Sequence, residues 1–185
     1  AARSTPPQIV YGTALLERGD DASRFFLLVR ALKQIQARAA TLARTVPTDL
    51  GPVVAGFLSA LADYNPEGVD PKRLAEAQKR VKSAIGKSLG NDVPMLALEV
   101  VGSLGSRASQ LATALNQWAN RVALLAVGSP LTALRALALA SNAELPAEGP
   151  ERLRWLGRHA EARDLAIFSV TEAYVEARKR LGVGG

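Results

Sequence analysis

The sequence predicts a mostly α-helical protein, a compact bundle of about seven or eight helices with at most a short N-terminal strand or hairpin. Apolar residues make up 48 % of the 185-residue chain and aromatic residues only 5 %. Alanine and leucine dominate the apolar share, which favours helices over sheets. Apolar residues also recur at intervals of three and four, which is the spacing of one helix face. Two helix starts are marked by a capping residue followed by proline, at Asp70-Pro71 and Ser129-Pro130.

The N-terminal part contains the one strand candidate and the first long helix. Ile9, Val10 and Tyr11 follow two prolines and precede Gly19-Asp20-Asp21, a pattern typical of a short strand that leads to a helix start. The helix is expected from Asp21 to about Arg44. Its apolar positions predict an inward face of Phe25, Leu28, Leu32, Ile35, Ala39 and Leu42.

Six further helical regions follow, separated by loops that contain proline or glycine. Thr48 is expected to cap a helix that runs to about Asp63, with Leu50, Val53, Val54, Phe57, Leu58 and Leu61 inward. The helix 106–127 is expected to bury Leu111, Leu115, Trp118, Val122 and Leu125. The remaining helices are expected at 70 to about 90, 95–104, 130–141 and 151–181, the last with a break near Gly157.

No boundary or repeat divides the chain, so residues 8–182 are interpreted as one domain, with 1–7 as a flexible N-terminal segment and 183–185 as a tail. The apolar stretch 122–140 is interrupted by Gly128-Ser129-Pro130 and contains Arg135, which argues against a membrane span. The absence of cysteine excludes disulfides and favours a reducing, cytoplasmic compartment. Because the chain starts without methionine, we expect a processed chain or a piece of a longer polypeptide.

A net charge of +6 raises the question of an anionic partner. The cations concentrate on the helix expected after Asp70, where nucleic acid or another acidic surface would meet Lys72, Arg73, Lys79, Arg80, Lys82 and Lys87. The alternative is an ordinary solvated helix face, because no aromatic residues alternate with these cations for base stacking. Two short motifs have simpler interpretations as helix ends or breaks: Ile85-Gly86-Lys87-Ser88 lacks the first glycine of a phosphate loop, and Gly102-Ser103-Leu104-Gly105 lacks the context of an RNA-binding loop.

Enzymatic chemistry has little support in the residue inventory. One histidine and no cysteine are too few for a catalytic zinc site, which normally draws on two or three such ligands. His159 is followed by Glu161 and lies near Ser169 and Thr171, so a base oriented by a carboxylate is one interpretation. A surface or capping histidine is the other. The carboxylates show no paired spacing, and no catalytic residue, metal or cofactor is assigned.

Two segments carry a family resemblance. Residues Ile9–Glu17, Asp20-Asp21 and Arg24–Ile35 resemble the strand, acidic loop and active-site helix of the CAAX-prenyl-endopeptidase and heat-shock zinc peptidase family. Asn116–Ala126 and the Ala/Leu-rich segment after Pro130 resemble the ExxAD helix of that family and the helix that follows it. Degenerate copies of the domain occur in large bacterial proteins beside helical repeats, and their C-terminal ends resemble Ala173–Gly182.

The resemblance implies a metal site without its ligands. Arg30 and Gln34 stand where the HExxH histidines belong, Ala31 replaces the catalytic glutamate, Asn116 the glutamate ligand and Asn120 the aspartate after it; Arg121 matches a common arginine. Arginine cannot ligate zinc, amides are poor ligands, and alanine offers no general base. These residues are expected either to form a hydrogen-bonded cluster in the former cleft or to be exposed helix residues.

The sequence therefore predicts a non-catalytic, pseudopeptidase-like helical domain that acts as a protein-interaction or structural module within a larger polypeptide or assembly. The partner is expected to be a protein. A basic helical module that binds nucleic acid or another acidic surface is the alternative function.

Overall fold

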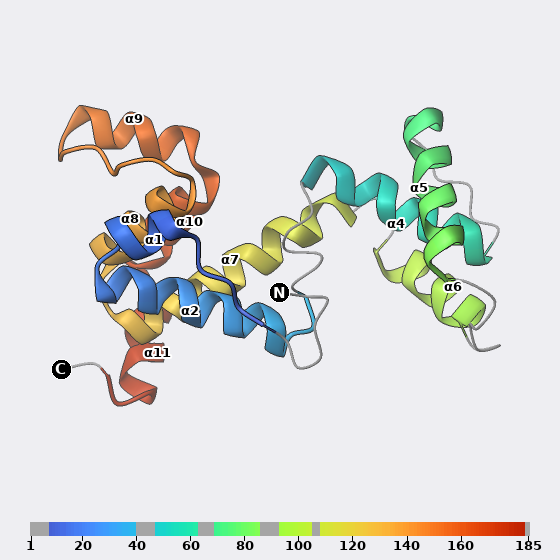
Figure 1. The fold of residues 1–185 in the computed structure, drawn as a ribbon. Helices are drawn as coiled ribbons and strands as arrows, with labels where there is room; N and C mark the ends of the chain where they lie inside the picture. The colour runs from blue at the N-terminus through green and yellow to red at the C-terminus, as the bar shows by residue number, and fades with distance from the viewer. Residues whose placement is uncertain (1–7, 40–46, 63–68, 86–92, 105–107, 184–185) are drawn as a thin grey trace. The chain divides into compact units, whose positions relative to one another are not determined.

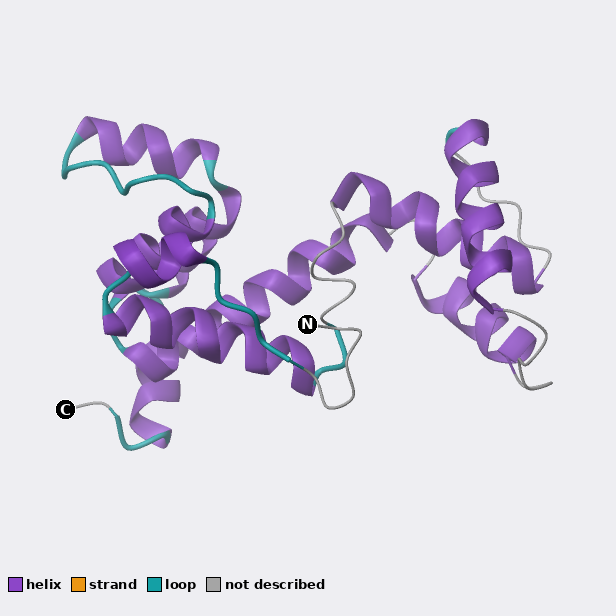
Figure 2. Cartoon of the chain, viewed as in Figure 1, coloured by secondary structure: helices purple, strands orange, loops and turns teal. Residues whose placement is uncertain are grey.

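The computed structural model describes residues 8–39, 47–62, 69–85, 93–104 and 108–183 (Figure 1). These residues form ten helices joined by loops and turns, and no strand is present among them (Figure 2). The predicted mostly α-helical fold class is confirmed. The described part of the chain contains more helices than expected, because the segment before Gly19 adds one and the C-terminal region divides into three.

The N-terminal strand prediction is wrong. Residues 8–12 belong to no strand, and the helix α1, Thr13–Arg18, follows them. A strand needs a neighbour to satisfy its backbone groups, and the described residues provide none. The α1 carbonyl groups instead receive side-chain hydrogen bonds, because Arg24 donates through Nη2 to the Leu16 oxygen at 2.6 Å and through Nε to the Leu15 oxygen at 3.4 Å.

The chain divides into two compact units. The first comprises residues 1–41 and 114–185, and the second comprises residues 42–113. This division differs from the single domain expected over 8–182. In the second unit, α4 (Pro47–Ala62) packs against α5 (Pro71–Ile85) and α6 (Val93–Leu104). No proline- or glycine-rich linker marks where the contacts change, so the local sequence carries no signal of the division.

The first unit is built around α8. This helix, Pro130–Ala140, contacts α2 (Asp21–Gln36), α1 and α10 (Ala160–Phe168). Small side chains let these helices approach closely. The buried core, which also includes residues of α7 (Ala108–Val127) and α11 (Glu172–Arg180), consists of Phe26, Ala123, Leu124, Ala133, Leu134, Ala136, Leu137, Ala162, Leu165 and Tyr174.

The second unit is held by a close crossing of α4 and α5. Gly56 lies against Ala77, since a Cβ atom added at Gly56 would fall 2.6 Å from the Ala77 Cβ. Leu58 and Ala97 are also buried, with 3 % and 2 % of their surface exposed. A larger side chain at Gly56 would therefore separate the two helices.

The predicted inward faces of α2 and α7 are correct only in part, because some of the large residues assigned inward are exposed. Phe25 and Leu32 on α2 are 48 % and 49 % exposed, while Phe26 is fully buried. On α7, Trp118 is 44 % exposed, and Asn120 instead has no exposed surface. Both helices carry apolar residues on most sides, so hydropathy alone did not distinguish the face. The same applies to Val53 and Phe57 of α4, which are 42 % and 39 % exposed.

The predicted caps Asp70 and Ser129 are confirmed, Asp20 also caps its helix, and the predicted cap Thr48 is wrong. Asp20 accepts from the Ser23 N–H at 2.6 Å, Asp70 from the Lys72 N–H at 2.8 Å and Ser129 from the Thr132 N–H at 3.3 Å. These side chains satisfy N–H groups that have no partner within their helices. The helix α4 begins at Pro47, so Thr48 lies inside the helix and is not its N-cap.

The helix α2 ends earlier than predicted, at Gln36 rather than near Arg44. Arg38 has a φ of +54°, and the Ala39 N–H bonds to the Gln34 oxygen at 2.9 Å while the Arg38 N–H bonds to the Ile35 oxygen. This is the Schellman pattern of a helix end. Glycine usually occupies the left-handed position, so the arginine gave no signal in the sequence.

The C-terminal region, expected as one helix with a break near Gly157, forms three helices. The first, α9, is Pro150–Arg158 and includes Gly157. Its end is His159, whose extended conformation also starts α10. The last helix, α11, begins after Thr171, whose hydroxyl accepts from the Tyr174 N–H at 3.3 Å. The two breaks in this region therefore occur at His159 and at Thr171, whose hydroxyl caps α11, and not at Gly157.

Candidate functional site

Arg30 and Gln34 lie on the buried side of α2. They are four residues apart and project from the same side of the helix. Ser23 and Phe26 precede Arg30 on this side at helical spacing and are only 2 % and 0 % exposed. The Arg30 side chain itself retains 22 % exposure. The polar pair therefore extends the packed face of α2 instead of facing water.

Asn116 and Asn120 occupy the buried side of α7. Their exposed fractions are 7 % and 0 %, and Ala119 and Ala123 beside them are equally buried. The alternative that these asparagines are exposed helix residues does not hold. Burial of an amide is costly unless its polar atoms find partners, so the neighbouring side chains decide whether this arrangement is stable.

Hydrogen bonds join the two helices at Asn116. Its Oδ1 atom accepts from the Gln34 Nε2 at 2.9 Å and from the Arg30 Nη2 at 3.2 Å. One amide oxygen with two lone pairs can serve both donors. The three residues that the resemblance assigns to ligand positions are thus brought into direct contact, and they bond to one another.

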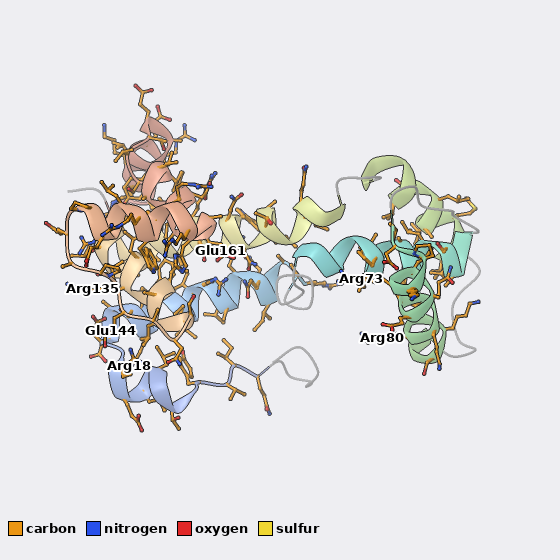
Figure 3. The ribbon with its side chains drawn as sticks, turned by 90° about the horizontal axis from the view of Figure 1, so that it is seen from above. Arg18, Arg73, Arg80, Arg135, Glu144 and Glu161 are labelled. Atoms are coloured by element: carbon orange, nitrogen blue, oxygen red, sulfur yellow. The ribbon has the colours of Figure 1, made fainter. Side chains whose placement is uncertain are left out.

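Glu161 completes the cluster from a third helix, α10. Its Oε2 atom accepts from the Arg30 Nη2 at 3.3 Å and from the Asn120 Nδ2 at 3.1 Å. The carboxylate balances the Arg30 charge and ties α10 to both α2 and α7; Figure 3 labels Glu161. We refer to Arg30, Gln34, Asn116, Asn120 and Glu161 as the polar cluster. From the sequence, Glu161 is linked only to its neighbour His159, because nothing local indicates a partner on another helix.

A second ion pair follows the cluster along α7 and α10. Arg121 binds Asp164 through two hydrogen bonds, from Nη2 at 2.6 Å and from Nε at 3.1 Å. The guanidinium group also lies 4.9 Å from the centre of the Phe168 ring. Such two-pronged pairs fix geometry better than single contacts. Asn120–Glu161 and Arg121–Asp164 together define how α10 lies on α7.

Two buried atoms of the polar cluster have no hydrogen-bond partner among the described residues, the Arg30 Nε and the Asn120 Oδ1. Exchanging the two ends of the Asn120 amide would set its oxygen against the Glu161 carboxylate, so Glu161 fixes the orientation. The first atom is a donor and the second an acceptor. Each unsatisfied group costs roughly 1–3 kcal/mol, so the cluster is not a purely stabilising element.

The chemistry of the polar cluster is that of one cation, one carboxylate and three amides. Ala31, which stands in the position of the catalytic glutamate, is half-buried. Among the described residues, no group of three or more His, Cys, Asp or Glu side chains could hold a metal ion. The single carboxylate already accepts from Arg30, whose charge would repel a metal ion placed beside it.

His159, Ser169 and Thr171 are occupied by backbone contacts. The His159 ring stacks on Trp155 with 4.3 Å between the ring centres, and its Nδ1 lies 2.8 Å from the Trp155 oxygen. Ser169 donates to the Ala166 oxygen at 2.7 Å, and Thr171 donates to the Phe168 oxygen at 2.8 Å. No hydrogen bond links the histidine to either hydroxyl in the described structure, so the capping interpretation of His159 fits its position between α9 and α10.

The basic residues of α5 lie opposite its packed side. Ala77 faces α4 with 7 % exposure, and the exposed cations are Lys72, Arg73, Lys79, Arg80 and Lys82. Arg73 and Arg80 are labelled in Figure 3. Lys87 lies outside the described residues, as do most of the segment Ile85–Ser88 and Gly105. Gly102 and Ser103 belong to the last turn of α6.

Within the described ranges, no helix is both long and apolar enough to cross a membrane. Comparisons of the chain with models of protein families, with characterised proteins and with solved structures found no match. The resemblance to zinc peptidases therefore stays a prediction, based on the residues that carry it.

Proposed function

We propose that this chain is a non-catalytic, pseudopeptidase-like helical module that serves protein interaction or assembly within a larger polypeptide. The observation that carries the proposal is the hydrogen bonding among the residues that the resemblance assigns to ligand positions. Asn116, assigned to a ligand position, accepts from the two residues assigned to the other ligand positions. A site whose polar groups are used in this way holds helices together instead of activating water.

The charge at the cluster gives a second line of support. Arginine is a cation in proteins, and Arg30 pairs with Glu161 at 3.3 Å. A metal ion at this place would have to displace that pair, and Ala31 offers no base to accept a proton from water. The residues that remain are suited to positioning α10 against α2 and α7, which is a structural role.

Exposed apolar side chains on α2 and α7 support the interaction role. Phe25, Leu32 and Trp118 are 44–49 % exposed, and the Lys33 ammonium lies 4.0 Å from the centre of the Trp118 ring. Aromatic residues are enriched in protein interfaces and among the residues that contribute most to binding. These residues lie outside the polar cluster, so the scaffold and the exposed surface are separate features of the same helices.

The first test is metal content and peptidase activity of the purified chain. We expect no stoichiometric zinc by elemental analysis and no peptide hydrolysis that a chelator abolishes. Stoichiometric zinc together with chelator-sensitive hydrolysis would refute the proposal.

A restoration variant tests the equivalence of the positions. Arg30→His, Ala31→Glu, Gln34→His and Asn116→Glu together would recreate the ligand set of the resembled family, and the present contacts of 2.9–3.2 Å show that the three ligand positions converge. We expect about one zinc per chain in this variant. The matched control, Leu32→His with Gln36→His and Asn116→Glu, has the same spacing on another side of α2 and should bind no stoichiometric zinc. Equal binding by both variants would contradict the assignment.

A further inference from the structure

The exposed side of α5 forms a compact positively charged surface that the polar cluster does not use. We call Lys72, Arg73, Lys79, Arg80 and Lys82 the basic face. All five side chains are exposed. Lys72 and Lys79 are seven residues apart, about two helical turns or 10 Å, so the cations are distributed along the helix and not gathered at one end.

The only acid on α5 compensates little of this charge. Glu76 lies 4.0 Å from Arg80, and both side chains are more than 70 % exposed. A pair of this kind contributes little and is screened by salt. Five cations and one carboxylate leave α5 with a net charge of +4, which makes it the most strongly charged helix among those described.

A shallow cavity of about 460 Å³ lies within the basic face, lined by Glu76, Lys79, Arg80 and Ser83. An ammonium, a guanidinium and a hydroxyl group here offer hydrogen-bond donors of the kinds that contact phosphate oxygens. The guanidinium can bind two oxygens at once, and the ammonium acts as a point charge. A phosphate group at this cavity could therefore contact Lys79, Arg80 and Ser83, while the Glu76 carboxylate on its lining would oppose part of that attraction.

The packing of α5 argues against a membrane surface as the partner. A helix that binds a bilayer buries an exposed apolar face between the lipid headgroups and acyl chains. The apolar side of α5 is already covered by α4, at the crossing of Gly56 and Ala77. Only the charged side is left for a partner, so binding would depend on electrostatics alone.

We propose that the basic face binds the phosphate backbone of double-stranded nucleic acid, without reading its sequence. A duplex presents closely and regularly spaced charges, which suit cations repeated along a helix. α5 contains no aromatic residue on which unpaired bases could stack, which favours a duplex over a single strand. This inference goes beyond the proposed structural role and does not depend on it.

The test measures binding of the full chain to a fluorescently labelled DNA duplex by anisotropy, between about 20 and 200 mM salt. We expect the affinity to fall steeply with salt, with a slope near −0.9 for each phosphate contacted. Two duplexes of unrelated sequence should bind equally. The variant Lys72→Gln with Lys79→Gln and Lys82→Gln should bind at least about tenfold more weakly at 100 mM salt and flatten the slope by up to about 3.

The matched control removes three exposed cations elsewhere, through Arg154→Gln, Lys179→Gln and Arg180→Gln. It has the same net charge as the α5 variant, and circular dichroism checks that both remain folded. Duplex binding close to that of the original chain supports the basic face as the site. An equal loss in both variants, or no duplex binding at 20 mM salt, would overturn the proposal. Binding to phosphatidylserine vesicles or polyglutamate with no preference for the duplex would overturn it as well.

Discussion

Glu161 is the residue on which the polar cluster depends, because among the described residues it is the one carboxylate that contacts both Arg30 and Asn120. Its removal takes the carboxylate away from the partly buried Arg30, which keeps only the Asn116 oxygen as an acceptor, and takes the acceptor away from the fully buried Asn120 amide. The cost of such orphaned groups exceeds the net gain of the bonds themselves. The cluster therefore contributes more to how specifically the helices pack than to their total stability.

The variant Glu161→Ala should lower the free energy of unfolding by about 1–3 kcal/mol, as measured by urea denaturation. The control Glu176→Ala removes a carboxylate from an exposed pair with Arg180 and should cost less than about 0.5 kcal/mol. A double-mutant cycle with Arg30→Met should give a coupling energy above about 0.5 kcal/mol. Equal effects of Glu161→Ala and Glu176→Ala would show that the cluster contact has no special role.

At the scale of the element, α2 depends on its two ends. Asp20 caps its start, and the left-handed Arg38 ends it. The hydrogen bond from the Ser23 backbone N–H holds the pKa of Asp20 below its ordinary value, aided by the nearby Arg135 and opposed by partial desolvation. A depressed carboxyl pKa means that the folded state favours the ionised form.

Asp20→Ala should destabilise the chain by about 1 kcal/mol near neutral pH through loss of the cap. Because the folded-state pKa is lowered, the ionic part of this contribution is present above the unfolded-state pKa of about 4 and is lost as pH falls through the folded value. The difference between the original chain and the variant should be constant above about pH 5 and shrink below pH 4. Urea denaturation from pH 3 to 7 measures it.

Ser129→Ala is the control for this pH dependence. The Ser129 hydroxyl caps α8 through the Thr132 N–H and does not titrate in this range, so its effect should be the same at every pH. If the Asp20 variant showed no change with pH, or a larger deficit in acid, the role given to the ionised carboxylate would be wrong.

At the scale of the whole molecule, two compact units and a single domain should respond differently to a substitution in the core. Leu58 is 3 % exposed in the second unit and Leu165 is 1 % exposed in the first. Substitution of either leucine by alanine should cost about 2–5 kcal/mol locally. With separate units, the cost should appear as lost amide protection in one set of helices only.

Native-state hydrogen exchange, followed residue by residue, tests whether the loss of amide protection is confined to one unit. Leu58→Ala should reduce protection in α4, α5 and α6 and leave α8 and α10 nearly unchanged, and Leu165→Ala should do the reverse. A uniform loss across all helices in both variants would instead support one cooperative domain over 8–182.

The candidate site was only partly predictable. Arg30, Gln34, Asn116 and Asn120 were selected because the family resemblance assigns them to site positions, and their spacing of four places each pair on one helix face. Glu161 could not be linked to them, since its partners lie 131 and 41 residues away in sequence. Phe25 and Trp118 were assigned to the core for their hydropathy, whereas the neighbouring Phe26 and Asn120 are buried. Hydrogen bonds within the polar cluster lower the free-energy cost of burying its side chains. The spacing of apolar residues carries no information about such bonds.

By itself the sequence determined the α-helical class, several helix starts and the scarcity of metal-ligating side chains, because propensity, capping and residue chemistry act over a few neighbouring positions. Tertiary structure alone decided which faces of α2 and α7 turn inward, that Glu161 bridges them, and that the contacts form two compact units. Those features depend on pairs of residues far apart in the chain, whose contact free energies no local pattern expresses.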